Sequence, residues 1–254
     1  VGHQGAVAVL CGDQLGVADP DGFFIEITRA LVLTAVCADG AGDERQCVLF
    51  GDELERRAVE PLAAELHVFG DILMNRAADE ERFKEIVRMI HNYEAYFAKY
   101  GEKAADNPTQ GNKAGGLSTL EDKSLGCIQK GGHCAVMEVL DYGERATKNG
   151  FVLISGPGND LAGVTGQIAA GAVLVIFTTG RGTPCGFAGP TFRLSSNTAL
   201  AQRKPRWIDY DAGRLLEART QEEVQALDTE LYDKVMLAIN GKKTCNEKNG
   251  YYMM

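Results

Sequence analysis

Residues 151–182, FVLISGPGNDLAGVTGQIAAGAVLVIFTTGRG, decide the fold that the sequence predicts. This stretch contains two short apolar runs, at 151–155 and 173–177, separated by a helix-like piece at 161–170. Two buried strands joined by a helical connection form a βαβ unit, and such units build parallel sheets that are covered by helices. We therefore expect an α/β fold with a parallel or mixed sheet, flanking helices and a Rossmann-like three-layer arrangement.

Both apolar runs end in glycine-bearing turns, at residues 156–160 and 178–182. Ligands of parallel sheets bind beyond the carboxyl ends of the strands, so we expect the two turns to face the same crevice. The second turn offers the hydroxyls of Thr178 and Thr179, backbone N–H groups and the guanidinium of Arg181. Because a guanidinium binds a carboxylate or phosphate through paired hydrogen bonds, such an anion is the expected ligand. An arginine that only ties down a loop is the alternative.

Two aspartates are candidates for metal binding or acid–base chemistry. Carboxylates suit hard divalent ions, and Asp160 and Asp122 both lie in glycine-rich surroundings. An aspartate that follows Gly-Asn, as Asp160 does, is more often a turn former or a helix N-cap. Spacing alone leaves both interpretations open.

The composition of residues 107–132 also indicates a role other than packing in the core. This segment contains six glycines and three lysines and has little apolar surface. Glycine lets the backbone approach a ligand closely and lysine supplies positive charge, so the composition suits a loop that surrounds an anion. A lysine that is desolvated or crowded by other cations can act as a general base, which makes Lys113 and Lys123 candidates. A solvated surface loop is the alternative.

Charge and cysteine usage limit the classes of partner. The 254 residues carry a net charge of −9, with a pI near 5.0, which argues against nucleic acid or an acidic membrane surface as the main partner. An anionic substrate would need a local basic pocket. The seven cysteines show no Cys-x-x-Cys spacing and are typical of reduced thiols, so we expect a cytoplasmic protein. No apolar run approaches the roughly 18 residues of a membrane span.

Other elements are visible in the pattern of apolar residues. Apolar side chains recur at helical spacing over residues 79–100 and again over 222–239, which predicts a helix in each place. The run at 7–10 leads into a turn, as a strand that opens an α/β unit does, and 191–195 is a candidate for one more strand.

Several longer motifs resemble those of the altronate dehydratase and galactarate dehydratase family and occur in the same order. They are GNKAGG at 111–116, DKSLG at 122–126, PGND at 157–160, FTTGRGTP at 177–184 and WIDYDAG at 207–213. The resemblance runs from about residue 72 to residue 250. The sequence departs from the family pattern at three places. Residues 12–24 read GDQLGVADPDGFF where the family has a Gly-Gly-Ser-Asp run. Asp211 stands where asparagine is expected, and Thr109-Gln110 where Ser-Pro is expected.

The resemblance implies a hydro-lyase of the cytoplasm that dehydrates a six-carbon sugar acid. D-altronate, giving 2-keto-3-deoxy-D-gluconate, is the best match, and a divalent metal, Fe²⁺ or Mn²⁺, is implied. It also implies an incomplete N-terminal segment at 1–70, a dehydratase C-terminal domain at 71–254, a homo-oligomer, and an N-terminal domain or subunit that is absent here. The alternatives are a lyase for galactarate or another hydroxy acid, and a non-catalytic subunit that binds sugar acids.

The resemblance and the chemistry together predict the site residues. The catalytic candidates are Lys113, Lys123 and Asp122, and the candidate metal ligands are Asp122 and Asp160. The substrate-binding candidates are Asn112, Gly115, Gly116, Asp160, Thr178, Thr179, Arg181 and Gly182.

Overall fold

A computed structural model of the chain describes most of its later half and parts of the first. The described residues are the strands at 6–11 and 47–50, then 74–101, 110–114, 116, 119, 135–148, 151–156, 160–182 and 185–251. Across these residues, no helix has the length and apolar character that crossing a bilayer would require.

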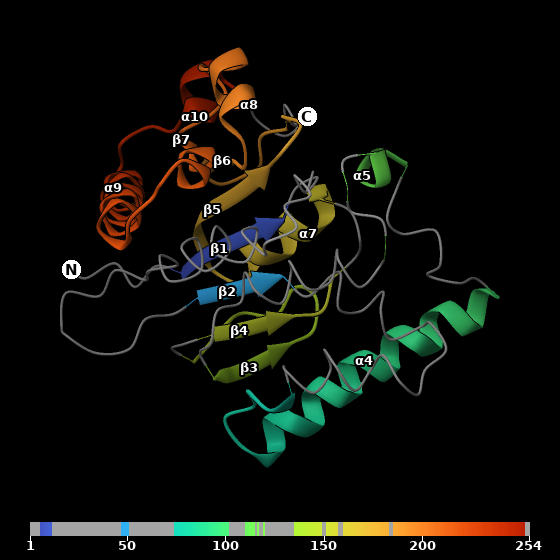
Figure 1. Cartoon of the computed structure of the whole chain (residues 1–254). Helices are drawn as coiled ribbons and strands as arrows, with labels where there is room; N and C mark the ends of the chain where they lie inside the picture. The colour runs from blue at the N-terminus through green and yellow to red at the C-terminus, as the bar shows by residue number, and fades with distance from the viewer. Residues whose placement is uncertain are drawn as a thin grey trace.

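The described strands form one seven-stranded sheet in the order β3-β4-β2-β1-β5-β6-β7, and every neighbouring pair is parallel (Figure 1). The predicted α/β fold with a parallel sheet is therefore confirmed. The strands are β1 Ala6–Cys11, β2 Cys47–Phe50, β3 Val136–Leu140, β4 Phe151–Ile154, β5 Ala172–Thr179, β6 Thr191–Ser195 and β7 Tyr210–Asp211.

Helices follow or connect these strands. They are α4 Glu80–Tyr100, α5 Gln110–Ala114, α7 Asp160–Ala169, α8 Thr198–Arg203, the 3-10 helix η2 Ala212–Leu216, α9 Gln221–Ile239 and α10 Cys245–Asn249. The two helices expected from apolar spacing are confirmed as α4 and α9. Acidic residues in the first turn of α4 match the helix dipole, and a capping box of Thr220 and Glu223 begins α9.

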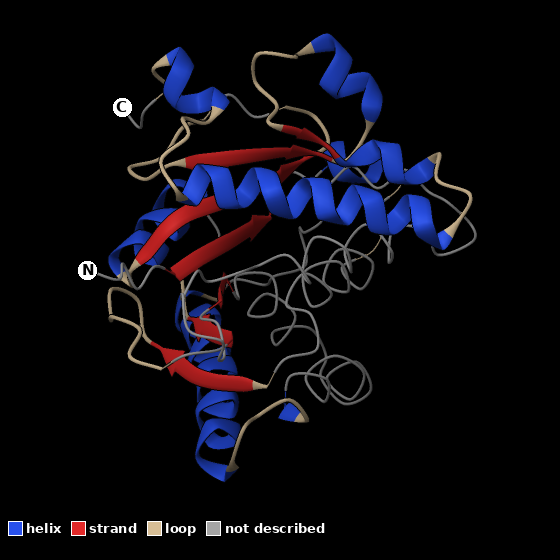
Figure 2. Cartoon of the chain, turned by 90° about the vertical axis from the view of Figure 1, so that its left-hand side faces the viewer, coloured by secondary structure: helices blue, strands red, loops and turns tan. Residues whose placement is uncertain are grey.

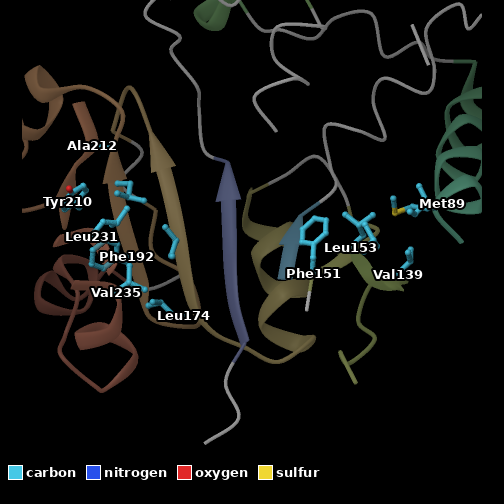
Figure 3. Packing of buried hydrophobic residues seen from close by; sticks show 14 of the residues in the cluster. Met89, Val139, Phe151, Leu153, Leu174, Phe192, Tyr210, Ala212, Leu231 and Val235 are labelled. Carbon is cyan, nitrogen blue, oxygen red and sulfur yellow. The ribbon is translucent and has the colours of Figure 1, made fainter. Parts of the chain in front are cut away.

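The strand register shows which face of the sheet each helix covers. Paired residues of parallel strands share a face, and pairing places Leu174 of β5 on the same face as Phe151 of β4, through β1 and β2. Both belong to a core that also contains Met89 of α4 and Leu231 of α9 (Figure 3). These two long helices lie toward opposite ends of the sheet, as Figure 1 and Figure 2 both show.

Helix α7 covers the other face. Val164 packs there against Val175 and Phe177 of β5, and Phe187 joins the cluster from the segment after β5. Each of these fully buried side chains contributes roughly 1.5–3 kcal/mol relative to an exposed one. The helices on the two faces complete the three-layer arrangement.

Strands β1 and β2 lie between β4 and β5, so strands from 1–70 and from 71–254 belong to a single sheet. The predicted domain boundary at residue 70 stays a prediction. The chain builds β2, β3 and β4 on one side of β1, then crosses to add β5, β6 and β7 on the other. The carboxyl ends of β1 and β5, where Cys11 pairs with Thr178, therefore lie at a switch point, which is where α/β sheets usually bind ligands.

Candidate functional site at the carboxyl edge of the sheet

The turn that follows β5 is folded by its own side chains. Thr178 and Thr179 are 6% and 1% exposed, and the Thr179 hydroxyl accepts a hydrogen bond of 2.9 Å from the N–H of Gly182. Gly182 has a φ of 90°, and an added Cβ would lie 2.9 Å from a methyl group of Leu200. The positive backbone angle favours glycine there, and an added Cβ would also force the Leu200 side chain to move. We call residues 179–182 the Arg181 turn.

The neighbouring strand holds this turn from the side. The N–H of Ser196 donates to the Thr179 carbonyl over 3.0 Å, and the Asn197 side chain donates to the Gly180 carbonyl over 3.0 Å. The Asn197 Oδ1 also accepts from the N–H of Leu200 over 2.8 Å and so caps α8. One asparagine thus fixes both the turn and the start of the helix that packs beside it.

Asp211 continues the network on the next strand. Its Oδ1 accepts from the N–H of Gly213 over 3.0 Å and from the Thr198 hydroxyl over 3.3 Å, which ties β7 and η2 to α8. An asparagine oxygen could accept the same two bonds, so aspartate at this position changes the charge more than the geometry. Gly213 lies so close to α8 that an added Cβ would be 2.3 Å from the Thr198 nitrogen.

Arg181 lies between two glycines whose backbones are held in this way, and its side chain is exposed. Within the described residues, its guanidinium takes part in no hydrogen bond or ion pair. A fixed backbone with an unpaired guanidinium at the sheet edge can bind an anion, and the fork of donors suits a carboxylate.

The other predicted site residues are placed only in part. Asp160 is the first residue of α7, where its charge matches the helix dipole. β4, which precedes Asp160, ends at the same edge of the sheet as β5, but β2 and β1 lie between, which separates the two strands by about 14 Å. Lys113 is exposed in the short helix α5, which Figure 1 draws on the side toward which the strand arrows point. Gly116 has a φ of 100°. Asp122, Lys123, Gly115 and the side chain of Asn112 lie outside the described residues.

A second polar cluster involves Cys185, three positions after the Arg181 turn, and it was not predicted from the sequence. Arg193 of β6 is completely buried, and its Nη2 donates to the carbonyl of Cys185. Asn246 of α10, 2% exposed, donates to the same carbonyl over 3.2 Å. The carboxylate of Asp209 accepts from the N–H of Arg193 over 2.8 Å and from the N–H of Cys245 over 2.7 Å. This cluster therefore joins β6, α10 and the segment after β5.

Burial dominates the electrostatics of this cluster. It lowers the pKa of the Arg193 guanidinium, an effect that the nearby Asp209 opposes. It raises the pKa of the Asp209 carboxyl, against the two backbone hydrogen bonds that favour the charged form. Burial and Asp209 together raise the pKa of Cys245 to about 11, so this thiol stays neutral near pH 7 and is a poor nucleophile.

The described residues do not by themselves hold a metal ion. Among them, no group of three or more His, Cys, Asp or Glu side chains comes together. Asp160 is the one predicted metal ligand whose position is described, and the others would have to come from the rest of the chain.

Comparison with known proteins gives the family. The family model described as D-galactarate/Altronate dehydratase, C-terminal, matches residues 60–254. The chain belongs to this family. The resemblance of the five motifs is thereby confirmed over most of the sequence.

Curated relatives agree with this assignment. The altronate dehydratase of Bacillus subtilis (strain 168) is 47% identical and that of Escherichia coli (strain K12) is 43% identical, each over 180 residues. These matches cover 71% of this chain and 36% of each relative. The galactarate dehydratase (L-threo-forming) of Escherichia coli (strain K12) is 35% identical over 173 residues, 68% of this chain and 33% of the relative. The chain thus spans about a third of the length of these relatives.

Proposed function

We propose that this chain carries part of the active site of a hydro-lyase that removes water from a six-carbon sugar acid. D-altronate is the best substrate and 2-keto-3-deoxy-D-gluconate the expected product. One observation carries the proposal: in a chain of the altronate and galactarate dehydratase family, the guanidinium of Arg181, which has no partner among the described residues, stands on a fixed turn beside the switch point. A sugar acid brings the carboxylate that such a guanidinium binds.

The reaction explains why a cation is needed at that place. Dehydration breaks the C–H bond next to the carboxylate and the C–O bond of the neighbouring hydroxyl. A base takes the proton, and an acid protonates the departing hydroxyl so that water leaves. The resulting enol then rearranges to the 2-keto acid. Loss of the proton puts a second negative charge next to the carboxylate, and a preorganised cation such as Arg181 stabilises that charge.

The remaining roles follow from position and chemistry. The Thr179 hydroxyl is engaged by the Gly182 N–H, so we assign Thr179 to support of the turn. Thr178, Gly182 and the glycine-rich segment, with Asn112, Gly115 and Gly116, would line the substrate site. Lys113 or Lys123 would act as the base; Lys113 is exposed, so the bound substrate or neighbouring cations would have to desolvate or crowd it for this role.

A divalent metal, Fe²⁺ or Mn²⁺, is part of the proposal. When bound, such an ion would add positive charge against the carboxylate and the enediolate. Asp160 and Asp122 are its candidate ligands. We also propose that the active protein is a cytoplasmic homo-oligomer and that a further domain or subunit completes the site.

Turnover of D-altronate by the purified protein tests the proposal directly. Formation of the 2-keto acid would be followed with ferrous or manganous ion and again with a chelator, and galactarate would be the comparison substrate. Metal-dependent product from D-altronate is the expected result. Faster turnover of galactarate would change the assigned substrate. A melting temperature raised by D-altronate without any product would favour the alternative of a non-catalytic sugar-acid-binding subunit.

Replacing Arg181 by Ala tests the residue that carries the proposal. We expect kcat/KM to fall by more than about tenfold, because the carboxylate loses its paired donors. Arg181→Lys should recover only part of the loss, since ammonium cannot form the fork. Arg88→Ala is the matched control: Arg88 is an exposed arginine of α4, which packs against β3, far from β5 in the strand order. Unchanged kinetics for Arg181→Ala would remove this residue from the site.

A further inference from the structure

We propose that Arg193 and Asn246 are positioning residues, which hold the Cys185 carbonyl and through it the Arg181 turn. The two side chains come from β6 and α10, and both donate to this one carbonyl. Two donors on a single carbonyl leave the backbone there little freedom. The functional part of the proposal rests on the role of Arg181 given above.

Stability alone does not explain a guanidinium at this place. Arg193 is fully buried, and its Nε and Nη1 have no hydrogen-bond partner among the described residues. Asp209 lies near enough to oppose the effect of burial on Arg193, but even a buried ion pair seldom stabilises a fold more than apolar side chains of similar volume do. Arg193 does donate a hydrogen bond to the Cys185 carbonyl, so we assign its role to this bond.

The donors themselves are held firmly. The Asp209 carboxylate bonds the backbone of Arg193 and that of Cys245, which locks β6 to the start of α10. Helix α10 also has a capping box of Thr244 and Glu247, which holds its first turn without Asn246. Arg193 and Asn246 therefore reach the Cys185 carbonyl from a rigid frame.

The Arg181 turn is close enough to be governed by this anchor. Three peptide links join Gly182 to Cys185, so their Cα atoms are at most about 11 Å apart. On its other side, Asn197 and Ser196 hold the turn. The segment that carries Arg181 is thus fastened before and after the guanidinium. Because catalysis is sensitive to misplacement of about 1 Å, a loosened anchor should affect the substrate carboxylate.

Hydrogen exchange of the Arg193→Met protein tests the anchor without relying on activity. We expect amides of the peptide at 178–190 to exchange at least about tenfold faster, while α9 and β4 keep their protection. The melting temperature should change by no more than about 3 °C, because methionine fills the volume while Asp209 keeps its two backbone N–H donors and the nearby charge of Lys248. Arg193→Lys, which keeps one donor, should restore much of the protection. Asn246→Leu removes the second donor at similar size and gives an independent variant.

Kinetic measurements then test whether the hydrogen bonds to the Cys185 carbonyl affect catalysis. In both variants kcat/KM for D-altronate should fall by roughly tenfold or more, in parallel with the faster exchange. Unchanged exchange at 178–190 in both variants would overturn the proposal. Uniformly faster exchange with a lower melting temperature would also overturn it, because the residues would then be merely structural. Faster local exchange with unchanged kinetics would support the anchor and instead count against Arg181 as a substrate ligand.

Discussion

At the scale of single residues, Gln167 is the buried side chain whose replacement is easiest to interpret. It lies on α7 with no exposed surface, and neither its Nε2 nor its Oε1 has a hydrogen-bond partner among the described residues. A buried amide without partners costs about 1–3 kcal/mol. Gln167→Leu should therefore leave the free energy of unfolding unchanged or raise it by about 1 kcal/mol in a urea titration.

Val164→Ala on the same helix is the control for that measurement. Val164 is fully buried against Val175 and Phe177, so removing its methyl groups should lower the free energy of unfolding by about 2 kcal/mol. A loss of more than about 1 kcal/mol for Gln167→Leu would mean that the amide has a partner in the folded protein.

Residue roles could be predicted where the chemistry is local in sequence. Thr178, Thr179 and Arg181 follow a run of apolar residues, and their place at a strand end is visible from the pattern alone. Arg193 was not visible, because the polar residues of TFRLS alternate with apolar ones and so look like the outward face of a strand. Asn246, which donates to the same Cys185 carbonyl, is 53 positions away, and such a shared contact leaves no periodic signal. The WIDYDAG motif contains Asp209, but only the fold shows that its carboxylate bonds the backbones of Arg193 and Cys245.

At the scale of elements, Glu138 fastens the segment after β3 back onto that strand. Its carboxylate accepts from the Thr147 hydroxyl over 2.6 Å and from the N–H groups of Thr147 and Lys148 over 2.9 and 3.2 Å. Burial alone would raise the pKa of Glu138, but these hydrogen bonds lower it further than burial raises it. The folded pKa therefore lies below the ordinary value, and the charged form stabilises the fold.

The sign of this shift gives a pH-dependent prediction. The stabilisation is fully present above the ordinary glutamate pKa of about 4.3 and is lost as the pH falls through the lowered folded value. Glu138→Gln should thus lower the free energy of unfolding by about 1 kcal/mol at pH 7 and by less near pH 3. Denaturant titrations at both pH values measure this, with Asp233→Asn, at an exposed position in the middle of α9, as the control. An equal loss at both pH values would contradict a charge-dependent contribution.

The helices and strands themselves were largely predictable from the sequence, but the order of the strands in the sheet was not. Long apolar periodicity gave α4 and α9, and the βαβ pattern gave β4, α7 and β5. The pattern does not say that β2 and β1 insert between β4 and β5. Crossover connections in α/β sheets can skip strands, and the length of the connecting helix does not fix how many are skipped. The strands that precede the two glycine-bearing turns therefore end at one edge without being adjacent.

At the scale of the whole molecule, the carboxyl edge is assembled from distant parts of the chain. The Arg181 turn, Asn197, Asp211 and Gly213 form one hydrogen-bonded network across β5, β6 and β7. This network joins strands of the sheet, and hydrophobic core clusters cover both faces of that sheet. A ligand bound at the edge would then stabilise the sheet as a whole, because the bound state requires these strands to be in place.

We therefore expect D-altronate to raise the melting temperature of the protein in a concentration-dependent way. At a ligand concentration one hundred times Kd, linkage predicts about 2.7 kcal/mol of added stability. Arg181→Ala should abolish most of the shift while leaving the melting temperature without ligand nearly unchanged, because Arg181 is exposed and unpaired among the described residues. Arg88→Ala should keep the full shift. If D-altronate stabilised Arg181→Ala as much as the unmodified protein, the carboxylate would bind elsewhere and the guanidinium would have no part in recognition.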